Sequence, residues 1–312
     1  MIQTIRTVIS ITLGLLVAIS LSVQAQQPIR YLTLSPPDGL PIIPVLEGWV
    51  ANVDGSRSIV FGYINRNDTA VDIPLGENNY IEPAEFDGLQ PTHFDTRRGP
   101  QIFAVTVPAD RANEDVWWYV TTGENEVLKV PGRAGNSAYE LDYIRPRPQG
   151  SLQPTVGFGE NGERARGNVA LVENFPGTVS AGTPVALTVN VEDLSERDST
   201  DIRFGEPLDV GIHWAQHQGP GKIEFTRHES TPEPEVRELP DGASAALRAR
   251  AARVPPTNEV KVKGGGIASV YATFSEPGEY MVRVMVENWS APDSSQGDQC
   301  CWSNAYQRIT VR

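Results

Sequence analysis

Two adjacent cysteines, Cys300 and Cys301, are the only thiols in the chain. Neighbouring side chains on a strand point to opposite faces, and consecutive Cα atoms lie about 3.8 Å apart, closer than the roughly 4.4–6.8 Å usual for disulfides. A bond between them therefore needs a turn, which the turn-rich segment 292–299 supplies. Because no third cysteine exists, we predict a Cys300–Cys301 disulfide, with free thiols, metal ligation and intermolecular bridges as the alternatives.

Histidines and methionines offer a second kind of chemistry. His213, His217 and His228 lie in GIHWAQHQGPGKIEFTRH, which reads as a hairpin turning at 218–221 with all three rings outward. His213 and His217 would be about 13 Å apart, too far to share an ion, whereas His213 and His228 would lie nearly diagonal across the hairpin. Met281 and Met285 also point outward, and with the thiols they predict a face suited to a soft ion such as Cu(I). The default interpretation is an ordinary polar surface whose methionines cover a neighbour, and the metal face is the alternative hypothesis.

An acidic segment, VEDLSERDSTD, offers carboxylates for a harder ion. Glu192, Asp193, Asp198 and Asp201 are its candidate calcium ligands. Their spacing matches no calcium loop closely, so a plain acidic loop is the default interpretation and a calcium site is the alternative.

Common catalytic signatures are missing from the sequence. It has no Gly-x-Ser-x-Gly elbow, His-Glu-x-x-His helix, phosphate-binding loop or dinucleotide fingerprint. The segment PTHFDTRRG brings His93, Asp95, Arg97 and Arg98 together, which indicates either an acid–base or anion-binding site or a salt-bridged loop. We therefore place an enzyme third among the functions considered, and we expect no cofactor.

Tryptophans suggest a binding surface. Trp117 and Trp118 are neighbours on a predicted strand, so their rings leave opposite faces and one must lie outside the core or under a covering loop. An exposed tryptophan can stack on a sugar ring or a partner protein, and Trp289 and Trp302 are similar candidates. The irregular segment 77–100 is the loop that would cover the outer ring.

The amino terminus predicts export. Residues 1–25 combine Arg6, an apolar run and a small-x-small ending at Ala25, which is typical of a cleaved signal peptide. No other apolar stretch approaches the roughly 20 residues that span a bilayer, so we expect no membrane insertion after cleavage. Of the 26 basic residues only Arg6 is removed, which leaves 25 against 39 acidic residues and a formal charge of −14. Such a surface disfavours nucleic acid and anionic lipid.

Apolar residues alternate with period two through the second half of the chain. One face carries Val185 to Val191, Ala268 to Phe274, Tyr280 to Val286, and Ile309 with Val311, taking every second residue. Strands buried on one side belong to antiparallel sheets, which predicts an all-β sandwich.

This half resembles an immunoglobulin-like sandwich. SEPGEYMVRV is similar to the tyrosine corner that precedes strand F, with Glu276, Gly278 and Tyr280, and Trp214 matches the tryptophan of strand C. It also resembles the polycystic-kidney-disease-type repeats of exported bacterial proteins, and the PTHF and CCW segments resemble a group of such proteins with no assigned activity. The resemblance implies a fold and no activity. Cysteine is absent where an antibody-type bridge would lie.

The first half likewise consists of short predicted strands separated by turn residues. Asp54-Gly55 is a predicted hairpin turn, and further strands are predicted at QIFAVTVPA, DVWWYVTT and EVLKVPG. We therefore predict two immunoglobulin-like antiparallel sandwiches in tandem, at 28–145 and 169–312. The proline- and glycine-rich stretch 146–168 is the predicted linker, and 229–256 is a polar insertion with a short helix at 242–253.

These features favour a non-enzymatic exported protein, periplasmic or extracellular, that binds a glycan or another protein or organises such molecules. The alternative is a periplasmic metal-handling or redox protein that uses the cysteine, methionine and histidine face. Neither reading identifies the ligand.

Overall fold

The computed structural model describes residues 39–141, 151–231, 239, 241–246, 248, 256–294 and 301–312. Their named elements are β-strands and four short 3₁₀ helices, η2 (Ala84–Phe86), η3 (Ala109–Arg111), η4 (Ser137–Tyr139) and η5 (Ile202–Phe204), and residues 245, 246 and 248 are α-helical. The predicted signal peptide lies outside these residues, and the predicted helix at 242–253 is described only in part. Within the described ranges, no helix has the length and apolar character needed to cross a bilayer.

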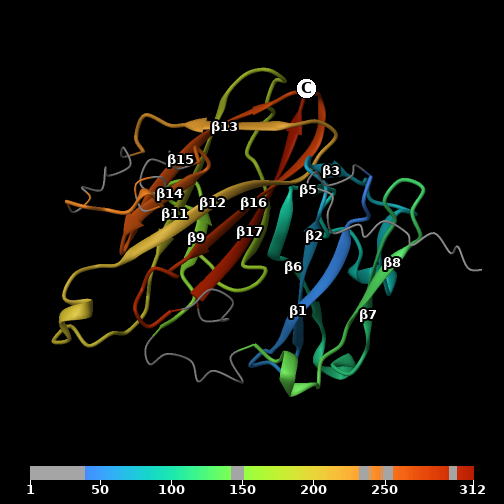
Figure 1. Ribbon diagram of the computed structural model, residues 1–312, viewed down its shortest axis with the longest axis horizontal. Coiled ribbons are helices and arrows are strands. Elements are labelled where there is room, and N and C mark those ends of the chain that lie inside the picture. The colour runs from blue at the N-terminus through green and yellow to red at the C-terminus, as the bar shows by residue number, and fades with distance from the viewer. Residues whose placement is uncertain are drawn as a thin grey trace, which may run out of the picture. The chain divides into compact units, whose positions relative to one another are not determined.

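The second half of the chain folds into two facing sheets (Figure 1). One sheet has the strand order β10-β17-β16-β12-β14 and the other β13-β15-β11-β9, and every pair is antiparallel except β10 with β17. This is the immunoglobulin arrangement, with β9, β11, β15 and β13 as strands A, B, E and D, and with β12, β16 and β17 as C, F and G. The strands are β9 (Thr155–Phe158), β10 (Leu171–Asn174), β11 (Val185–Glu192), β12 (Asp209–Gln218), β13 (Ile223–Arg227), β14 (Glu259–Lys263), β15 (Gly265–Phe274), β16 (Gly278–Glu287) and β17 (Trp302–Val311).

The core of this sandwich confirms the alternation read from the sequence. Leu187, Val270 and Val284 are among the predicted inward residues, and all are buried in one cluster with Trp214. The tyrosine corner is also present, because the Tyr280 hydroxyl donates a 2.9 Å hydrogen bond to the backbone carbonyl of Glu276. The resemblance therefore predicted the corner and the strand C tryptophan correctly.

The first half of the chain forms a smaller antiparallel sandwich. The sheet β1-β2-β6 packs against the sheet β4-β7-β8, and β3 pairs with β5 beside them. Gly132 on β8 allows the close approach, because a Cβ there would lie 2.5 Å from the Ile59 side chain. The strands are β1 (Ile43–Ala51), β2 (Arg57–Asn65), β3 (Val71–Asp72), β4 (Asn79–Glu82), β5 (His93–Phe94), β6 (Arg97–Val107), β7 (Val116–Val120) and β8 (Leu128–Gly132).

The first half covers the outer face of β12, β16 and β17. Met281 and Tyr306 are buried in the hydrophobic cluster of the first half, and the Tyr306 hydroxyl donates a 2.9 Å hydrogen bond to the Ile102 carbonyl. Asn304 donates a similar bond to the Gln101 carbonyl, also at 2.9 Å. Residues 37–312 accordingly form one compact unit.

Two predictions about connections are wrong. Residues 155–158, inside the predicted linker, form the fully buried strand β9, which pairs with β11. The segment 218–221 does not turn a hairpin, because β12 pairs with β14 and β16 whereas β13 pairs with β15 in the opposite sheet.

Candidate functional site

The outer face of the β4-β7-β8 sheet carries a group of aromatic side chains. Val116, Trp118 and Val120 on β7 point into the core, and Trp118 is completely buried. Trp117 and Tyr119 alternate with them and are half-buried on the other side of the sheet. The sequence therefore predicted correctly that the two tryptophan rings leave opposite faces.

Cross-strand register gathers further side chains around these two rings. Tyr119 lies opposite Tyr80 on β4 and Lys129 on β8, and Trp117 lies opposite Glu82 and Pro131. We call Tyr80, Glu82, Trp117, Tyr119, Lys129 and Pro131 the aromatic face. The Tyr80 and Tyr119 rings stack with centroids 4.6 Å apart and planes 5° from parallel.

Polar groups lie directly beside the rings of the aromatic face. The Lys129 ammonium lies 5.0 Å from the Trp117 ring centroid and 5.2 Å from that of Tyr119, and each such exposed contact contributes about 0.5–1 kcal/mol. A hydrogen bond with the Glu82 carboxylate raises the pKa of Tyr119. The face thus joins apolar ring surface to a fixed ammonium, a carboxylate and two phenol hydroxyls.

The interval 77–100 does not cover Trp117. Its residues Asn79–Glu82 form β4, which pairs edge to edge with β7 and contributes Tyr80 to the same face. The predicted covering loop is thus partly a strand of the sheet.

His93 lies between two carboxylates. Its Nδ1 is 2.7 Å from Asp72 and its Nε2 is 3.4 Å from Asp95. Burial alone would lower the His93 pKa, but the bonds to both aspartates outweigh it and raise the pKa to about 9. The imidazolium in turn lowers the pKa of Asp95. Arg97 is exposed and makes no ion pair with a described residue, so this segment has the geometry of a salt-bridged loop.

The predicted metal residues do not share one face. His213 sits between Glu259 and Glu287, at 3.5 and 3.4 Å, whereas His228 follows β13 in the other sheet and contacts Tyr271. Met281 is buried under the first half, while Met285 is half-buried beside Arg283. No cluster of three potential ligands occurs among the described residues. The hypothesis of a copper face is therefore wrong, because β12 and β13 belong to different sheets, and Met281 instead packs against the first half.

His217 differs from its prediction as well. It is buried rather than outward, and its Nε2 donates a 2.6 Å hydrogen bond to the Leu89 carbonyl of the first half. A register shift between Gln216 and Gln218 accompanies this contact.

The C-terminal segment is packed inside the molecule. Trp302 is completely buried against Val60 and Ala104 of the first half, so its ring is not available to a ligand, contrary to the prediction. Cys301 is also completely buried, and it is not a free thiol. Cys300 lies outside the described residues, so the vicinal pairing stays a prediction.

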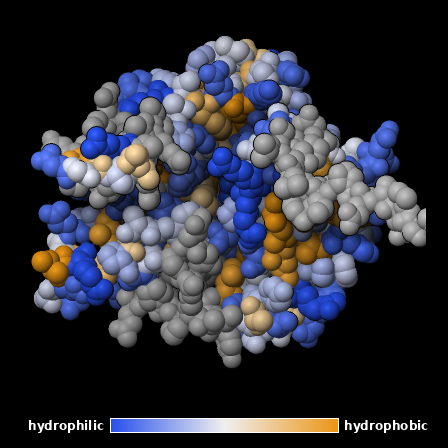
Figure 2. Space-filling model, in the orientation of Figure 1, coloured by the Kyte–Doolittle hydropathy of each residue, from blue (hydrophilic) through white to orange (hydrophobic). Residues whose placement is uncertain are grey.

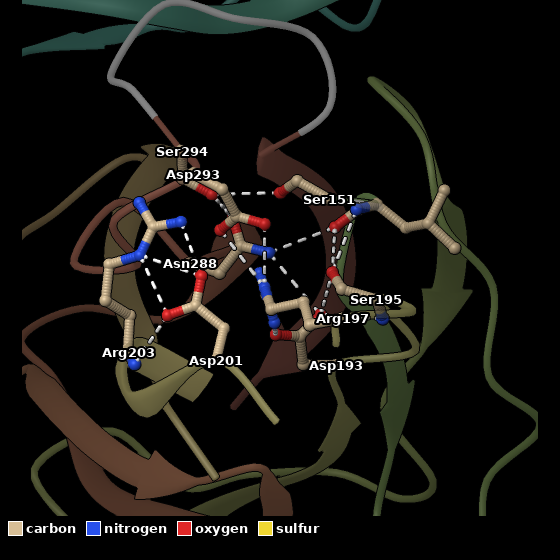
Figure 3. Close-up of polar contacts among 10 residues, drawn as sticks. Ser151, Asp193, Ser195, Arg197, Asp201, Arg203, Asn288, Asp293 and Ser294 are labelled. Carbon is tan, nitrogen blue, oxygen red and sulfur yellow. Dashed lines mark hydrogen bonds and ion pairs between the residues drawn. The ribbon is translucent and has the colours of Figure 1, made fainter. Parts of the chain in front are cut away.

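The acidic segment after β11 holds an arginine rather than calcium. Figure 3 shows Arg197 between Asp193 and Asp293, with ion-pair distances of 2.7 and 2.9 Å, and with Arg203 paired to Asp201 beside it. A cavity of about 390 Å³ lies next to this network. Because guanidinium groups already neutralise these carboxylates, the network joins the loop after β11 to the loop after β16. The calcium alternative is therefore contradicted at Asp193 and Asp201, each of which pairs with an arginine.

Of the six residues of the aromatic face, the sequence analysis named only Trp117 and missed Tyr80, Glu82, Tyr119, Lys129 and Pro131. Tyr119 was recoverable, because it stands two positions after Trp117 on the same strand. Tyr80 and Lys129 depend on the register of β4 and β8, which the sequence of one strand does not contain. The side of the molecule in Figure 2 is largely hydrophilic, with hydrophobic side chains in a few patches, in keeping with the net charge of −13.

No protein-family model and no curated protein matches the chain. Among solved structures, a conjugative transposon lipoprotein from Bacteroides eggerthii is 10% identical, with a TM-score of 0.25 over 52% of this chain and 99% of that one. The D0–D1 domain of intimin is 11% identical, with a TM-score of 0.22 over 86% of this chain and 97% of that one. CfaE, the adhesive subunit of the CFA/I fimbria of enterotoxigenic Escherichia coli, is 10% identical, with a TM-score of 0.21 over 87% of both chains. Scores this low support no inference about the present chain.

Proposed function

We propose that this protein is a non-enzymatic binding protein whose ligand contacts the aromatic face. The observation that supports the proposal is the gathering of Tyr80, Trp117 and Tyr119 on one outer sheet surface, next to Lys129 and Glu82. Aromatic rings bordered by hydrogen-bonding groups suit a ligand that has both apolar and polar surfaces. Export through the predicted signal peptide would bring this face to extracytoplasmic ligands.

The size of the aromatic face favours a glycan over a protein. β7 has five residues, so at about 3.4 Å per residue and about 4.8 Å between strands the three strands offer a patch of roughly 17 Å by 10 Å. Stable protein complexes bury about 800 Å² on each partner. A patch of roughly 170 Å² matches a few sugar rings instead, with C–H surfaces against the aromatic rings and hydroxyls bonded to Lys129 and Glu82.

A glycan array and affinity electrophoresis test this proposal. We expect the parent protein to bind at least one polysaccharide and Trp117→Ala to lose that binding with an unchanged melting temperature. Tyr139→Ala is the matched control, because Tyr139 is an exposed aromatic residue outside the face. Absence of binding to every glycan, or equal binding by Trp117→Ala, would refute the proposal. Trp118→Ala is unsuitable as a probe, since it removes a core side chain.

The predictions about fold subtype, export, the cysteine pair and metal handling are separate from the aromatic face. The polycystic-kidney-disease-type assignment, the signal peptide and the choice between periplasm and exterior remain predictions. We also propose that Cys301 pairs with Cys300, the chain's other cysteine. Intact-mass analysis without reductant should give a monomer 2 Da lighter than the dithiol, as expected for loss of about two hydrogens, and two alkylatable thiols would disprove the pairing. The separation of His213, His228 and the methionines leaves the metal-handling alternative without a site among the described residues.

A further inference from the structure

A second concave site lies on the second-half sandwich, away from the aromatic face. It is a cleft of about 400 Å³ between β9 and β11 of one sheet and β10 and β17 of the other. Volumes of roughly 300–1,000 Å³ are typical of small-molecule sites. Phe158, Phe175, Ala186, Thr188, Glu173 and Gln307 are among its lining residues.

The cleft exists because β9 is shorter than the strand beside it. β9 pairs only with Val189–Glu192 of β11 and ends at Phe158. Residues 185–188 of β11 therefore have no strand neighbour on that side among the described residues. On the opposite sheet, β10 is also short and ends at Asn174.

Gln307 is the unusual residue of this cleft. Ala305 and Ile309, two positions before and after it on β17, belong to the hydrophobic core, so alternation places Gln307 on the inner face of the sandwich. Its cross-strand partner Val282 is a core residue as well. The sequence thus puts a carboxamide where the pattern calls for an apolar side chain.

The amide of Gln307 has no hydrogen-bond partner among the described residues, although the residue is only 5% exposed. Buried polar groups are nearly always paired, because an unpaired one loses its hydration without compensation. Gln307 lines the cleft, and its amide is not among the sealed unpartnered atoms of the interior. The unmade hydrogen bonds are therefore open to a molecule in the cleft.

The other lining residues narrow the chemistry of that molecule. Phe158, Phe175 and Ala186 supply apolar surface, and Glu173 adds a carboxylate, while no basic residue lines the cleft. An anion would meet only negative charge there. A carboxamide offers a donor and an acceptor side by side, which is complementary to a primary amide, a lactam or the equivalent edge of a heterocycle.

We propose that this cleft binds a small, neutral, planar molecule with adjacent donor and acceptor groups, held by two hydrogen bonds to Gln307 and by apolar contact with Phe158 and Phe175. The unpaired amide is retained for binding and not for folding. Stability and affinity should therefore respond in opposite directions when Gln307 is changed.

Ligand-observed NMR with nicotinamide and uracil, representing a primary amide and a lactam, tests the proposal. We expect saturable binding of at least one of them and at least tenfold weaker binding of nicotinate, which has the nicotinamide ring but carries a charge and no donor. Gln307→Leu should abolish binding while the melting temperature stays equal or rises, since it replaces an unpaired buried amide with an apolar group. Ala186→Leu, which narrows the cleft without touching Gln307, should also weaken binding.

Three results would overturn the proposal. They are absence of saturable binding by both probes, binding that survives Gln307→Leu, and a melting temperature that falls by several degrees in Gln307→Leu. The last result would assign the amide a structural role. None of them bears on the aromatic face, because the two sites share no residue.

Discussion

His217 should make the stability of this protein fall on mild acidification. Burial lowers the pKa of its imidazole to about 3 and outweighs the raising effect of the hydrogen bond to the Leu89 carbonyl, while the Arg283 charge adds a smaller lowering. In the unfolded chain the pKa is about 6.5. Between these values the unfolded state binds a proton that the folded state does not, so stability is present above about pH 6.5 and is lost as the pH falls toward 3.

The size of this effect follows from the two pKa values. From pH 7 to pH 5 the unfolded imidazole becomes almost fully protonated while the folded one stays neutral, which costs about 2 kcal/mol of unfolding free energy. His217→Gln removes the titrating group, and its side-chain amide retains a donor for the Leu89 carbonyl. The variant should therefore lose about 2 kcal/mol less than the parent between these pH values.

Urea denaturation at pH 7 and pH 5 measures the difference. Parent and variant share every other titrating group, so the carboxylates contribute equally to both and cancel in the comparison. Equal losses in the two proteins would refute the reasoning, because His217 would then be accessible to protons in the folded state. Gln218→Ala is the matched control, because it removes hydrogen bonds to the same segment of the first half but no titrating group, so it should keep the parental pH dependence.

Three further predictions concern packing and charge. The pKa of His93 is raised to about 9, so the stability that the charged His93 contributes is present below pH 6.5 and is lost as the pH rises through 9. Asp95→Asn should lower the midpoint of the His93 titration measured by NMR. An unchanged midpoint would contradict the ion pair. Gly132→Ala should destabilise the protein by about 1–3 kcal/mol in thermal unfolding, because its Cβ would lie 2.5 Å from Ile59 and from Phe61. Gly205→Ala should not, because its Cβ would meet only the Ile202 carbonyl oxygen, at 3.9 Å. Arg197→Met should lower the unfolding free energy by about 3 kcal/mol, because it leaves the Asp193 and Asp293 carboxylates without a counter-ion. Arg203→Met removes an exposed ion pair and should change the unfolding free energy little. Similar effects of the two variants would argue against the network.

The local sequence predicted the strands because apolar and polar side chains alternate with a period of two residues within each segment. The inward sets of β11, β15 and β16 were read correctly for this reason, as were the opposite directions of Trp117 and Trp118. The tyrosine corner was recognisable because its hydrogen bond joins residues only four apart, Tyr280 and Glu276.

Long-range placement was beyond local pattern. The sequence Gly219-Pro220-Gly221 is compatible both with a hairpin turn and with a connection that crosses from one sheet to the other. In this protein the connection crosses, and the Tyr280 hydroxyl stabilises it by accepting a hydrogen bond from the Gly221 amide. His217, Met281 and Trp302 are buried by residues more than a hundred positions earlier in the chain. In the candidate site, the sequence of β7 predicted the directions of the two tryptophan rings, but the stacking of Tyr80 and the position of Lys129 depend on pairing between strands.

The burial of Trp302 sets a condition on the order in which the chain can reach its native packing. A chain made from its amino terminus completes the first half early, yet Val60 and Ala104 on that half are covered by Trp302 on β17, about 200 residues later. Until β17 has been made, the first half carries an apolar patch that only Trp302 covers among the described residues. Removal of β17 should therefore leave two exposed apolar surfaces instead of one intact half, and a nascent chain of this protein should need chaperones until β17 has been synthesised.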